Sequence, residues 1–484
     1  MKQSTALDIL KTGQNVFLTG QAGAGKTHVL NQYIAYLRAR RVPVAITAST
    51  GIAATHISGM TIHAWSGMGI KDSFDNNDYQ RLKHRPTLTE RLKDTKVLIV
   101  DEISMLHAKQ VDLLDEILRT IRDNEHAFGG VQVIFSGDFF QLPPVGNKGE
   151  NNKEKFAFMA KAWLHANFQI CYLGEQHRQN AQHEKQQFGI SLNQILNQIR
   201  QQDVEQGAID TLLATKHHNI DATCTHLYTH NADVDNINEE KLSALTGKPH
   251  TFVCTTYGDK VLVETLKKNV RANETLTLKV GARVMFVKNN NTLNVSNGTM
   301  GKVIDFASTQ TSLSKNTTDS AYPVVQLTTG RTVIAEPEEW VIESHQGEVL
   351  ASYSQVPLCL AWAITIHKSQ GMTLDAAKID LSYTFEAGQG YVALSRLRSL
   401  DGLKLLGLNK NSLLLDEWVF RVDKRLLELS QEHETRFCRL DKTAIKKMHQ
   451  QFIKNCGGVI RPTKNDRKSK QSTQPKTKAT NENT

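Results

Sequence analysis

The chain has 484 residues, of which 39% are hydrophobic and 22% are charged, so it is long enough for about three globular domains and is not disordered throughout. Its formal net charge is +9, but residues 461–484 contain seven Lys or Arg against two acidic residues and so carry +5 of that charge. Basicity is therefore only weak evidence for a nucleic-acid partner, because a solvated tail accounts for most of it.

The cysteines and the apolar segments indicate the compartment. The cysteines are scattered, without a CxxC or a Cys/His pair at zinc-ligand spacing, which is typical of a reducing compartment and of a protein without a structural metal. Asp8 and Lys11 lie where a signal peptide needs apolar residues, and no segment reaches about 18 consecutive apolar residues. We expect a soluble intracellular protein without a membrane partner. The six cysteines are Cys171, Cys224, Cys254, Cys359, Cys438 and Cys456.

A phosphate-binding loop follows the first predicted strand. Residues 15–19 form an apolar run, residues 29–37 carry apolar side chains at helical spacing, and the pattern GxxxxGK[ST] lies between them. Such a loop turns its N–H groups towards the phosphates of ATP, with Lys26 on the β and γ oxygens and Thr27 on magnesium. The alternative is a tight turn with an incidental lysine. The loop residues are Gly20, Gln21, Ala22, Gly23, Ala24, Gly25, Lys26 and Thr27.

Two carboxylates follow a later strand. Apolar runs at 44–46, 97–100 and 131–135, separated by helical stretches, predict a parallel α/β sheet in a first domain. Asp101 and Glu102 come directly after the second run, at the edge where α/β sheets bind ligands. Asp101 can hold magnesium while Glu102 orients or deprotonates the attacking water. The alternative is an acidic N-cap of the next helix.

A turn with two prolines follows the third run, at residues 136–144. Gln141 in this turn could sense the γ-phosphate, and the Pro-Pro pair would stiffen the loop that carries it. Trp65, Phe139 and Phe140 either stack on DNA bases or, as aromatic residues of α/β proteins more often do, belong to the core.

After the first domain, a second α/β pattern follows and is interrupted by a stretch of short predicted strands. A second α/β set begins at residues 225–229 and resumes at 356–366, and the short strands between them, with the turn signal Asn297-Gly298, predict an inserted β-barrel. The tail is Lys-, Ser-, Thr- and Gln-rich and is expected to be disordered. The predicted domains are residues 1–172 with a polar surface insertion at 67–96, residues 173–249 with 346–430, the β-barrel at 250–345, a helical segment at 431–460 and the tail at 461–484.

The run FGGVQVIFSGDFFQLPPV at residues 128–145 is similar to the signature of the Pif-one family of superfamily 1B DNA helicases. The likeness covers most of residues 1–430, whereas RecD-type relatives share the nucleotide site but match this run less closely. The resemblance implies two RecA-like domains, ATP and magnesium as cofactors, single-stranded DNA and DNA junctions as partners, and movement from 5′ to 3′.

The resemblance also implies roles for single residues. Gln3 stands where the family reads adenine, and residues 47–65 resemble motif Ia, which holds DNA phosphates. Arg178 matches motif IV, although residues 175–177 depart from its apolar lead-in, while residues 361–373 and 391–396 match motifs V and VI. These motifs assign DNA binding to Thr50, Gly51, His63, Trp65, Thr365, His367 and Lys368, ATP contact to Gln370 and Gly371, and catalysis to Arg178 and Arg396.

The role of Arg396 also follows from chemistry. Hydrolysis places growing negative charge on the γ-phosphoryl group, and a planar guanidinium from a second domain can neutralise it. ATP at Lys26 would then draw the two halves together and hydrolysis would release them, so that a strand gripped alternately by motifs Ia and V would be moved along. The alternatives are a surface ion pair for Arg396 and an ordinary polar loop for His367 and Lys368.

We therefore expect a monomeric α/β protein with two RecA-like P-loop domains, which acts as an ATP-dependent, magnesium-requiring DNA helicase in replication, repair or recombination. One alternative is another P-loop ATPase without unwinding activity, such as a ring-forming ATPase or a nucleotide kinase. The other is a non-catalytic DNA-binding protein with an inactive nucleotide fold. The nucleotide-site residues of this chain are intact, which argues against the non-catalytic alternative.

Overall fold

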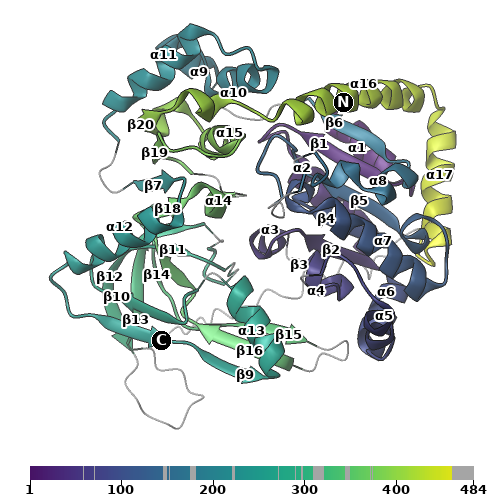
Figure 1. Ribbon diagram of the computed structural model, residues 1–484, viewed down its shortest axis with the longest axis horizontal. Coiled ribbons are helices and arrows are strands. Elements are labelled where there is room, and N and C mark those ends of the chain that lie inside the picture. Colours follow the sequence, from purple (N-terminus) through teal and green to yellow (C-terminus); the bar gives the residue numbers. More distant parts are fainter. Residues whose placement is uncertain are drawn as a thin grey trace, which may run out of the picture.

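The computed structural model of the protein describes residues 1–57, 59–69, 71–144, 150–151, 153–174, 181–220, 224–270, 272–288, 290, 292–295, 298–308, 321–343, 349–370, 372 and 374–460. Figure 1 shows a large parallel sheet on the right, a smaller one at the upper left, and a β-rich unit below the smaller sheet. A long helix runs along the top from one parallel sheet to the other. In the described ranges no helix is long and apolar enough to cross a bilayer.

The first sheet has six parallel strands in the order β3-β2-β4-β5-β1-β6. Alternate residues of its central strands point to opposite faces, so Phe17 and Phe135 join one apolar core while Val16, Leu18 and Ile134 join another. Burial on both faces explains the continuous apolar runs of the sequence. The strands are β1 (Val16–Gly20), β2 (Val44–Ala48), β3 (Met60–Thr61), β4 (Val97–Asp101), β5 (Gln132–Ser136) and β6 (Gln169–Leu173).

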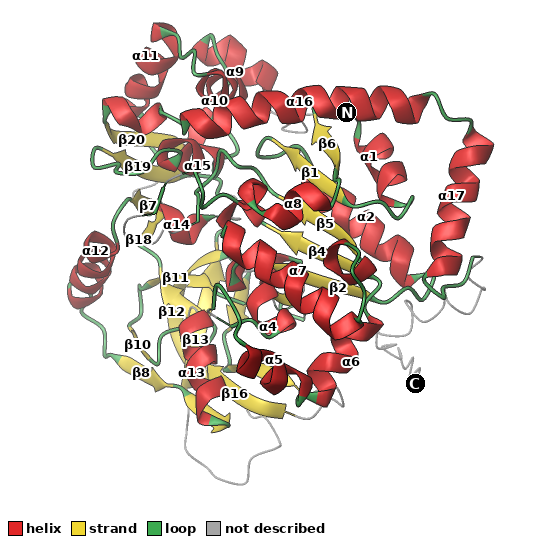
Figure 2. Cartoon of the chain, turned by 45° about the vertical axis from the view of Figure 1, so that its right-hand side comes forward, coloured by secondary structure: helices red, strands yellow, loops and turns green. Residues whose placement is uncertain are grey.

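Helices cover both faces of this sheet (Figure 2). The segment 67–96, predicted as a polar surface insertion, folds into two helices whose Leu82, Leu88 and Leu92 are buried in the larger core, so it is anchored to the domain. The helices and 3-10 turns of this half are α1 (Gln3–Leu10), α2 (Lys26–Arg38), α3 (Gly51–His56), α4 (Ile62–Ser66), α5 (Asn76–Lys83), α6 (Pro86–Asp94), η1 (Ile103–Met105), α7 (Ala108–Arg122), η2 (Ala127–Gly130), η3 (Ala157–Met159) and α8 (Lys161–His165).

The second parallel sheet has four strands in the order β18-β7-β19-β20. Two parallel α/β sheets in one chain confirm the predicted fold class. The strands are β7 (Thr225–Tyr228), β18 (Ala363–Thr365), β19 (Ala377–Leu381) and β20 (Leu403–Leu408). The accompanying helices and turns are α9 (Ala181–Phe188), α10 (Leu192–Gln201), α11 (Gln206–Ala214), η4 (Thr215–His217), α12 (Asn231–Ser243), α14 (Ile366–Ser369), α15 (Gln389–Ser395), η5 (Leu400–Gly402) and η6 (Lys410–Leu413).

The inserted β-rich unit forms three antiparallel sheets among the described residues, with five, three and two strands. The five- and two-stranded sheets enclose one apolar core that includes Leu278, Phe286, Val303 and Val325. Its elements are β8 (His250–Val253), β9 (Thr255–Gly258), α13 (Lys260–Asn269), β10 (Thr275–Leu278), β11 (Arg283–Phe286), β12 (Met300–Ser308), β13 (Ala321–Leu327), β14 (Thr332–Ile334), β15 (Glu338–Glu343), β16 (Val349–Gln355) and β17 (Leu358–Leu360).

The predicted end of this unit at residue 345 is wrong. β16 pairs with β15 and β9, and β17 pairs with β11, so the unit continues to Leu360. The single apolar run at 356–366 is divided, because β18 leaves for the second parallel sheet after two intervening residues. A continuous apolar run does not reveal that its two ends belong to different sheets.

The predicted boundary at residue 430 also falls inside an element. Residues 417–438 form one helix, α16 (Glu417–Cys438), without an internal Gly or Pro, and α17 (Lys442–Asn455) follows it. α16 covers the edge strand β6, where Tyr172 N–H donates to Ser430 Oγ at 3.0 Å and Ile170 N–H donates to His433 Nδ1 at 2.9 Å. The helix therefore closes an edge that would otherwise expose unpaired backbone groups.

α17 packs against the first half of the chain, where His449 Nε2 lies 2.9 Å from the Asp8 carbonyl oxygen and a further contact is aromatic. The Phe452 ring lies over Gly13, where an ideal Cβ would come within 2.2 Å of it, and Ile453 beside it is buried. We expect Phe452→Ala to lower the melting temperature by a few degrees, because about 2 kcal/mol of apolar packing is lost. Lys447→Ala, on the exposed side of α17, should change it by less than a degree. Equal melting temperatures for the two variants in calorimetry would contradict this account of the contact.

Candidate nucleotide site and nucleic-acid interface

The predicted phosphate loop joins β1 to α2. Gly20, Gly23 and Gly25 have φ angles of +142°, +84° and +87°, and residues with a Cβ rarely adopt these angles. A Cβ on Gly25 would also lie 2.1 Å from Gln3 Nε2, and this amide donates to the Ala24 carbonyl at 3.0 Å. The glycines are therefore required by the geometry of the loop, and Gln3 of α1 lies directly against it.

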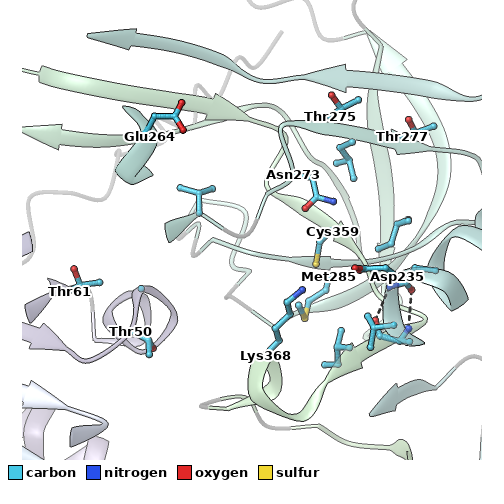
Figure 3. Close-up of a pocket in the computed structure, with 18 of the residues that line it drawn as sticks. Thr50, Thr61, Asp235, Glu264, Asn273, Thr275, Thr277, Met285, Cys359 and Lys368 are labelled. Carbon is cyan, nitrogen blue, oxygen red and sulfur yellow. Dashed lines mark hydrogen bonds between the residues drawn. The ribbon is translucent and has the colours of Figure 1, made fainter. Parts of the chain in front are cut away.

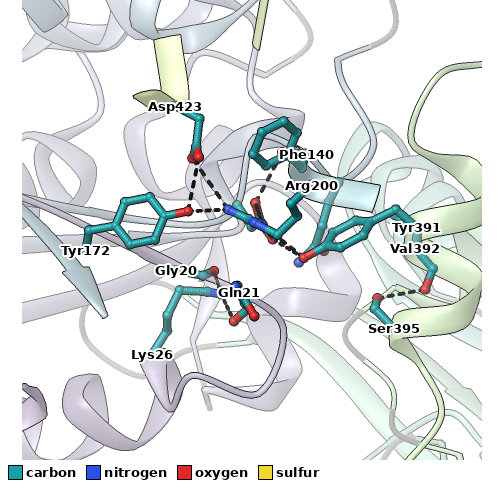
Figure 4. Close-up of polar contacts among 12 residues, drawn as sticks. Gly20, Gln21, Lys26, Phe140, Tyr172, Arg200, Tyr391, Val392, Ser395 and Asp423 are labelled. Atoms are coloured by element: carbon teal, nitrogen blue, oxygen red, sulfur yellow. Dashed lines mark hydrogen bonds and ion pairs between the residues drawn. The ribbon is translucent and has the colours of Figure 1, made fainter. Parts of the chain in front are cut away.

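Lys26 lies at the centre of the loop and is partly buried. Its Nζ donates to the carbonyl oxygens of Gly20 at 2.7 Å and Gln21 at 3.2 Å (Figure 4). Burial lowers the pKa of Lys26, whereas attraction to Asp138, Glu102 and, more weakly, Asp101 opposes that change. Three acidic groups from the carboxyl edge of the first sheet therefore face the lysine that would hold the phosphates.

Asp101 and Glu102 lie where β4 ends; Asp101 is buried and Glu102 is partly buried. Glu102 has a φ of +52°, a backbone conformation that costs a non-glycine residue energy and is concentrated at functional sites. Burial, followed by repulsion from Asp101, raises the pKa of Glu102 to about 7. Glu102 occupies the N-cap position of η1 but makes no capping hydrogen bond, so the alternative of an acidic N-cap is wrong for this side chain. Its buried Oε2 has no hydrogen-bond partner and can accept one from a water.

Gln141 of the first half contacts the second half directly. Its Oε1 accepts a hydrogen bond at 3.3 Å from Nε2 of Gln370, which follows α14 in the second half, and both side chains are buried. Gln370 Oε1 has no hydrogen-bond partner. Two of the predicted site residues, Arg178 and Gly371, lie outside the described residues.

Arg396 is the C-cap of α15 and is only 5% exposed, so the alternative of a surface ion pair is wrong. Its Nε donates to the Val392 carbonyl at 3.1 Å and its Nη2 to Ser395 Oγ at 2.7 Å. Its positive charge also lowers the pKa of Glu102, although burial has the larger, opposite effect. The arginine of the second half thus lies within electrostatic range of the carboxylate that ends β4.

One buried arginine was missed by the sequence analysis. Arg200 of α10 donates through Nη1 to both oxygens of Asp138, at 2.8 and 2.7 Å, and to Tyr391 Oη at 2.9 Å (Figure 4). Through Nη2 it donates to Tyr172 Oη at 2.5 Å and approaches Asp423 at 3.4 Å. The signal was present in the sequence, because Arg200 occupies the i+8 position of an apolar stripe that begins at Leu192, where a charge needs a buried partner.

A cavity of about 1680 Å³ lies where the two parallel sheets and the β-rich unit meet (Figure 3). From the first half it is lined by six residues of the predicted motif Ia segment, and from the second half by residues that include Lys368. Asn273, Thr275 and Thr277 line it from the β-rich unit. Asp235, Glu239 and Glu264 also contribute, so its charge is mixed. The six residues of the motif Ia segment are Ser49, Thr50, Gly51, Thr61, His63 and Ala64.

The remaining residues predicted to contact DNA do not line this cavity. Thr365 is the N-cap of α14, where its Oγ1 accepts from Lys368 N at 3.2 Å, and His367 Nε2 lies 3.6 Å from Glu386. Of the two interpretations left open for Trp65, Phe139 and Phe140, their burial favours the core, because the three rings are 2%, 5% and 2% exposed. The Phe140 ring instead lies 4.4 Å from the Arg200 guanidinium.

The comparisons with known proteins agree with this architecture. The family model of PIF1-like helicases matches residues 2–210, and that of the DNA helicase Pif1 2B domain matches residues 262–306. An ATP-dependent DNA helicase Pif1 of Psychrobacter sp. (strain PRwf-1) is 53% identical over 500 residues, covering 95% of this chain and 76% of the relative.

Two solved structures are similar over most of the chain. The Pif1 helicase from Candida albicans is 35% identical, with a TM-score of 0.74 over 88% of this chain and 98% of that one. A Pif1 helicase from Bacteroides in complex with ADP-AlF3 and ssDNA is 30% identical, with a TM-score of 0.62 over 88% of this chain and 96% of that one.

The fold and the site define a P-loop ATPase with two RecA-like domains in one chain. The chain belongs to the PIF1-like helicase family and is an ATP-dependent DNA helicase. The predicted family and activity are therefore confirmed, and both alternatives, a P-loop ATPase without unwinding and a non-catalytic DNA-binding protein, are set aside.

Proposed function

We propose that the loop from Gly20 to Thr27 binds the phosphates of ATP and that Lys26 neutralises the β and γ oxygens. Gln3 reads the adenine from its place against the loop, and Gln141 and Gln370 meet the γ-phosphate from the two halves. The observation that supports this most directly is the convergence of Lys26, Asp101, Glu102 and Asp138 at one sheet edge, with Arg396 in electrostatic range of Glu102.

Magnesium is assigned to Thr27 and Asp101. The described residues contain no cluster of three or more His, Cys, Asp or Glu that could bind a metal. Two protein ligands suit magnesium, which keeps several waters and takes phosphate oxygens as further ligands. When bound, the ion neutralises charge on the phosphates. Glu102, with its unpartnered buried oxygen, accepts the proton of the attacking water, and Arg396 and Arg178 stabilise the charge on the transferred phosphoryl group.

Single-stranded DNA is assigned to the cavity between the three units. Thr50, Gly51, His63 and Lys368 line it, and Thr365 and His367 lie on the same short segment as Lys368. ATP binding between Gln141 and Gln370 would change the distance between these two sets of contacts, and hydrolysis would reverse the change. We therefore propose a monomeric motor that moves from 5′ to 3′ and acts on DNA junctions in replication, repair or recombination inside the cell.

The direction of movement is tested with tailed duplexes. With ATP and magnesium, a duplex with a 5′ single-stranded tail should be unwound, whereas the same duplex with a 3′ tail should remain paired. Strand separation is followed on native gels, with the non-hydrolysable ATP analogue as the blank. Unwinding of the 3′-tailed substrate alone would reverse the proposed polarity and leave the helicase assignment intact.

The DNA cavity is tested through the salt dependence of binding. Lys368→Ala should reduce the slope of log K against log salt by about 0.7, which is the contribution of one phosphate contact on a single strand. Lys424→Ala, an exposed lysine of α16 outside the cavity, is the matched control and should leave the slope unchanged. Equal slopes for the two variants would remove Lys368 from the DNA interface.

A further inference from the structure

Arg200 is a buried cation that neither hydrolysis nor DNA binding, as proposed above, requires. It is 5% exposed, Asp138 is 1% exposed and Tyr391 is 1% exposed. Tyr391 Oη also donates to Asp138 Oδ2 at 3.0 Å, so the three groups form a closed triangle of hydrogen bonds. We call Arg200, Asp138 and Tyr391 the Arg200 clamp.

The clamp joins parts that are distant in the sequence. Asp138 follows β5 of the first sheet and lies three residues before Gln141, while Tyr391 is on α15 of the second half, five residues before Arg396. Burial alone would raise the pKa of Asp138, but attraction to Arg200 and Lys26 outweighs it and lowers the pKa. Asp138 is therefore ionised and pairs with Arg200 beside the phosphate loop.

Such a cluster is a poor means of gaining stability, because two buried charges lose their hydration. Its value lies in fixing one arrangement, since a planar guanidinium holds its partners at set angles. Here the arrangement includes Tyr391 of α15. The same helix orients the Arg396 side chain, because Arg396 Nε donates a hydrogen bond to the Val392 carbonyl. Whatever orients Tyr391 thus orients the helix that carries Arg396.

We propose that Arg200 is a positioning residue for hydrolysis: the Arg200 clamp locks α15 against the first sheet and so sets Arg396 over the nucleotide site. This inference rests on the proposed role of Arg396 and deepens it. The clamp acts on the transition state, where Arg396 is needed, and not on the binding of ATP.

Tyr391→Phe is the first test, because it removes one hydroxyl and keeps the ring. We expect kcat for DNA-stimulated ATP hydrolysis to fall about tenfold, the scale of one charge-assisted hydrogen bond, while KM for ATP stays within about twofold. Tyr33→Phe is the matched control: it removes an equally buried hydroxyl, which donates to Gln132 Oε1 at 2.7 Å, from the opposite face of the first sheet. Its kcat should stay within about twofold of wild type.

The second test separates positioning from general damage. If Tyr391 acts through Arg396, then Tyr391→Phe should lower kcat about tenfold in the wild-type chain but less than twofold in an Arg396→Ala background. Arg200→Lys keeps a cation beside Asp138 but loses the planar fork, so it should fold and show the same dependence on Arg396.

Additive losses in the double variants, or equal losses for Tyr33→Phe and Tyr391→Phe, would overturn the inference. An Arg396→Ala single variant with full turnover would instead refute the proposed role of Arg396 itself. The two failures are thus distinguished in one set of proteins.

Discussion

Glu102→Gln is expected to lower kcat for ATP hydrolysis by about 10³-fold while ATP still binds, because the amide keeps the shape of the side chain but cannot accept a proton. Lys26→Ala should lose hydrolysis and weaken ATP binding as well, since it removes the charge that faces the phosphates. The comparison requires ATPase rates with saturating single-stranded DNA and direct measurement of nucleotide binding.

Glu90→Gln provides the matched control for this experiment. Glu90 is an exposed residue of α6, so the same loss of one charge there should leave both kcat and ATP binding unchanged. A Glu102→Gln protein that hydrolyses ATP near the wild-type rate would show that the base is another group.

The second large effect is expected at Arg396. Arg396→Ala should reduce kcat by about 10³-fold or more, the range known for arginine fingers, with little change in affinity for single-stranded DNA. Arg398→Ala is a close control, because Arg398 lies two residues further along, is 67% exposed and forms its ion pair with Asp375 at the surface. Its turnover should stay within about twofold of wild type.

Mixing two inactive proteins then tests whether the site is built within one chain. Lys26 and Arg396 belong to the two halves of the same polypeptide, so a mixture of Lys26→Ala and Arg396→Ala should not recover activity. Recovered ATP hydrolysis would mean that the arginine is supplied by a neighbouring chain, as in a ring-forming ATPase.

The parts of the site that sequence analysis predicted are those with local signals. The glycines of the phosphate loop, Lys26, and the carboxylates after β4 lie in short patterns whose chemistry and flanking elements can be read together. The apolar stripe of α10 indicates only that Arg200 needs a buried partner and not which one, because its partners come from residues 138, 172, 391 and 423 and meet only in the folded chain.

The errors in the fold have a related cause. The division of residues 356–366 between two sheets and the extension of the β-rich unit to Leu360 depend on which strand is paired with which, and hydrophobic periodicity does not contain that information. The aromatic residues were ambiguous for a similar reason: the same ring can stack on a base or fill a core, and Trp65 and Phe139 fill the core.

The path of α16 restricts how the two halves can part. Three of its residues, Asp423, Ser430 and His433, bond to Tyr172 and Ile170 of β6, so the helix is attached to the first sheet. It begins at Glu417, only nine residues after β20 of the second sheet ends at Leu408. A movement of the second parallel sheet relative to the first would therefore have to be accommodated in part between these two residues, on the β6 side of the molecule. The cavity is lined by residues next to β3, at the opposite edge of the first sheet, so its width would change most in such a movement.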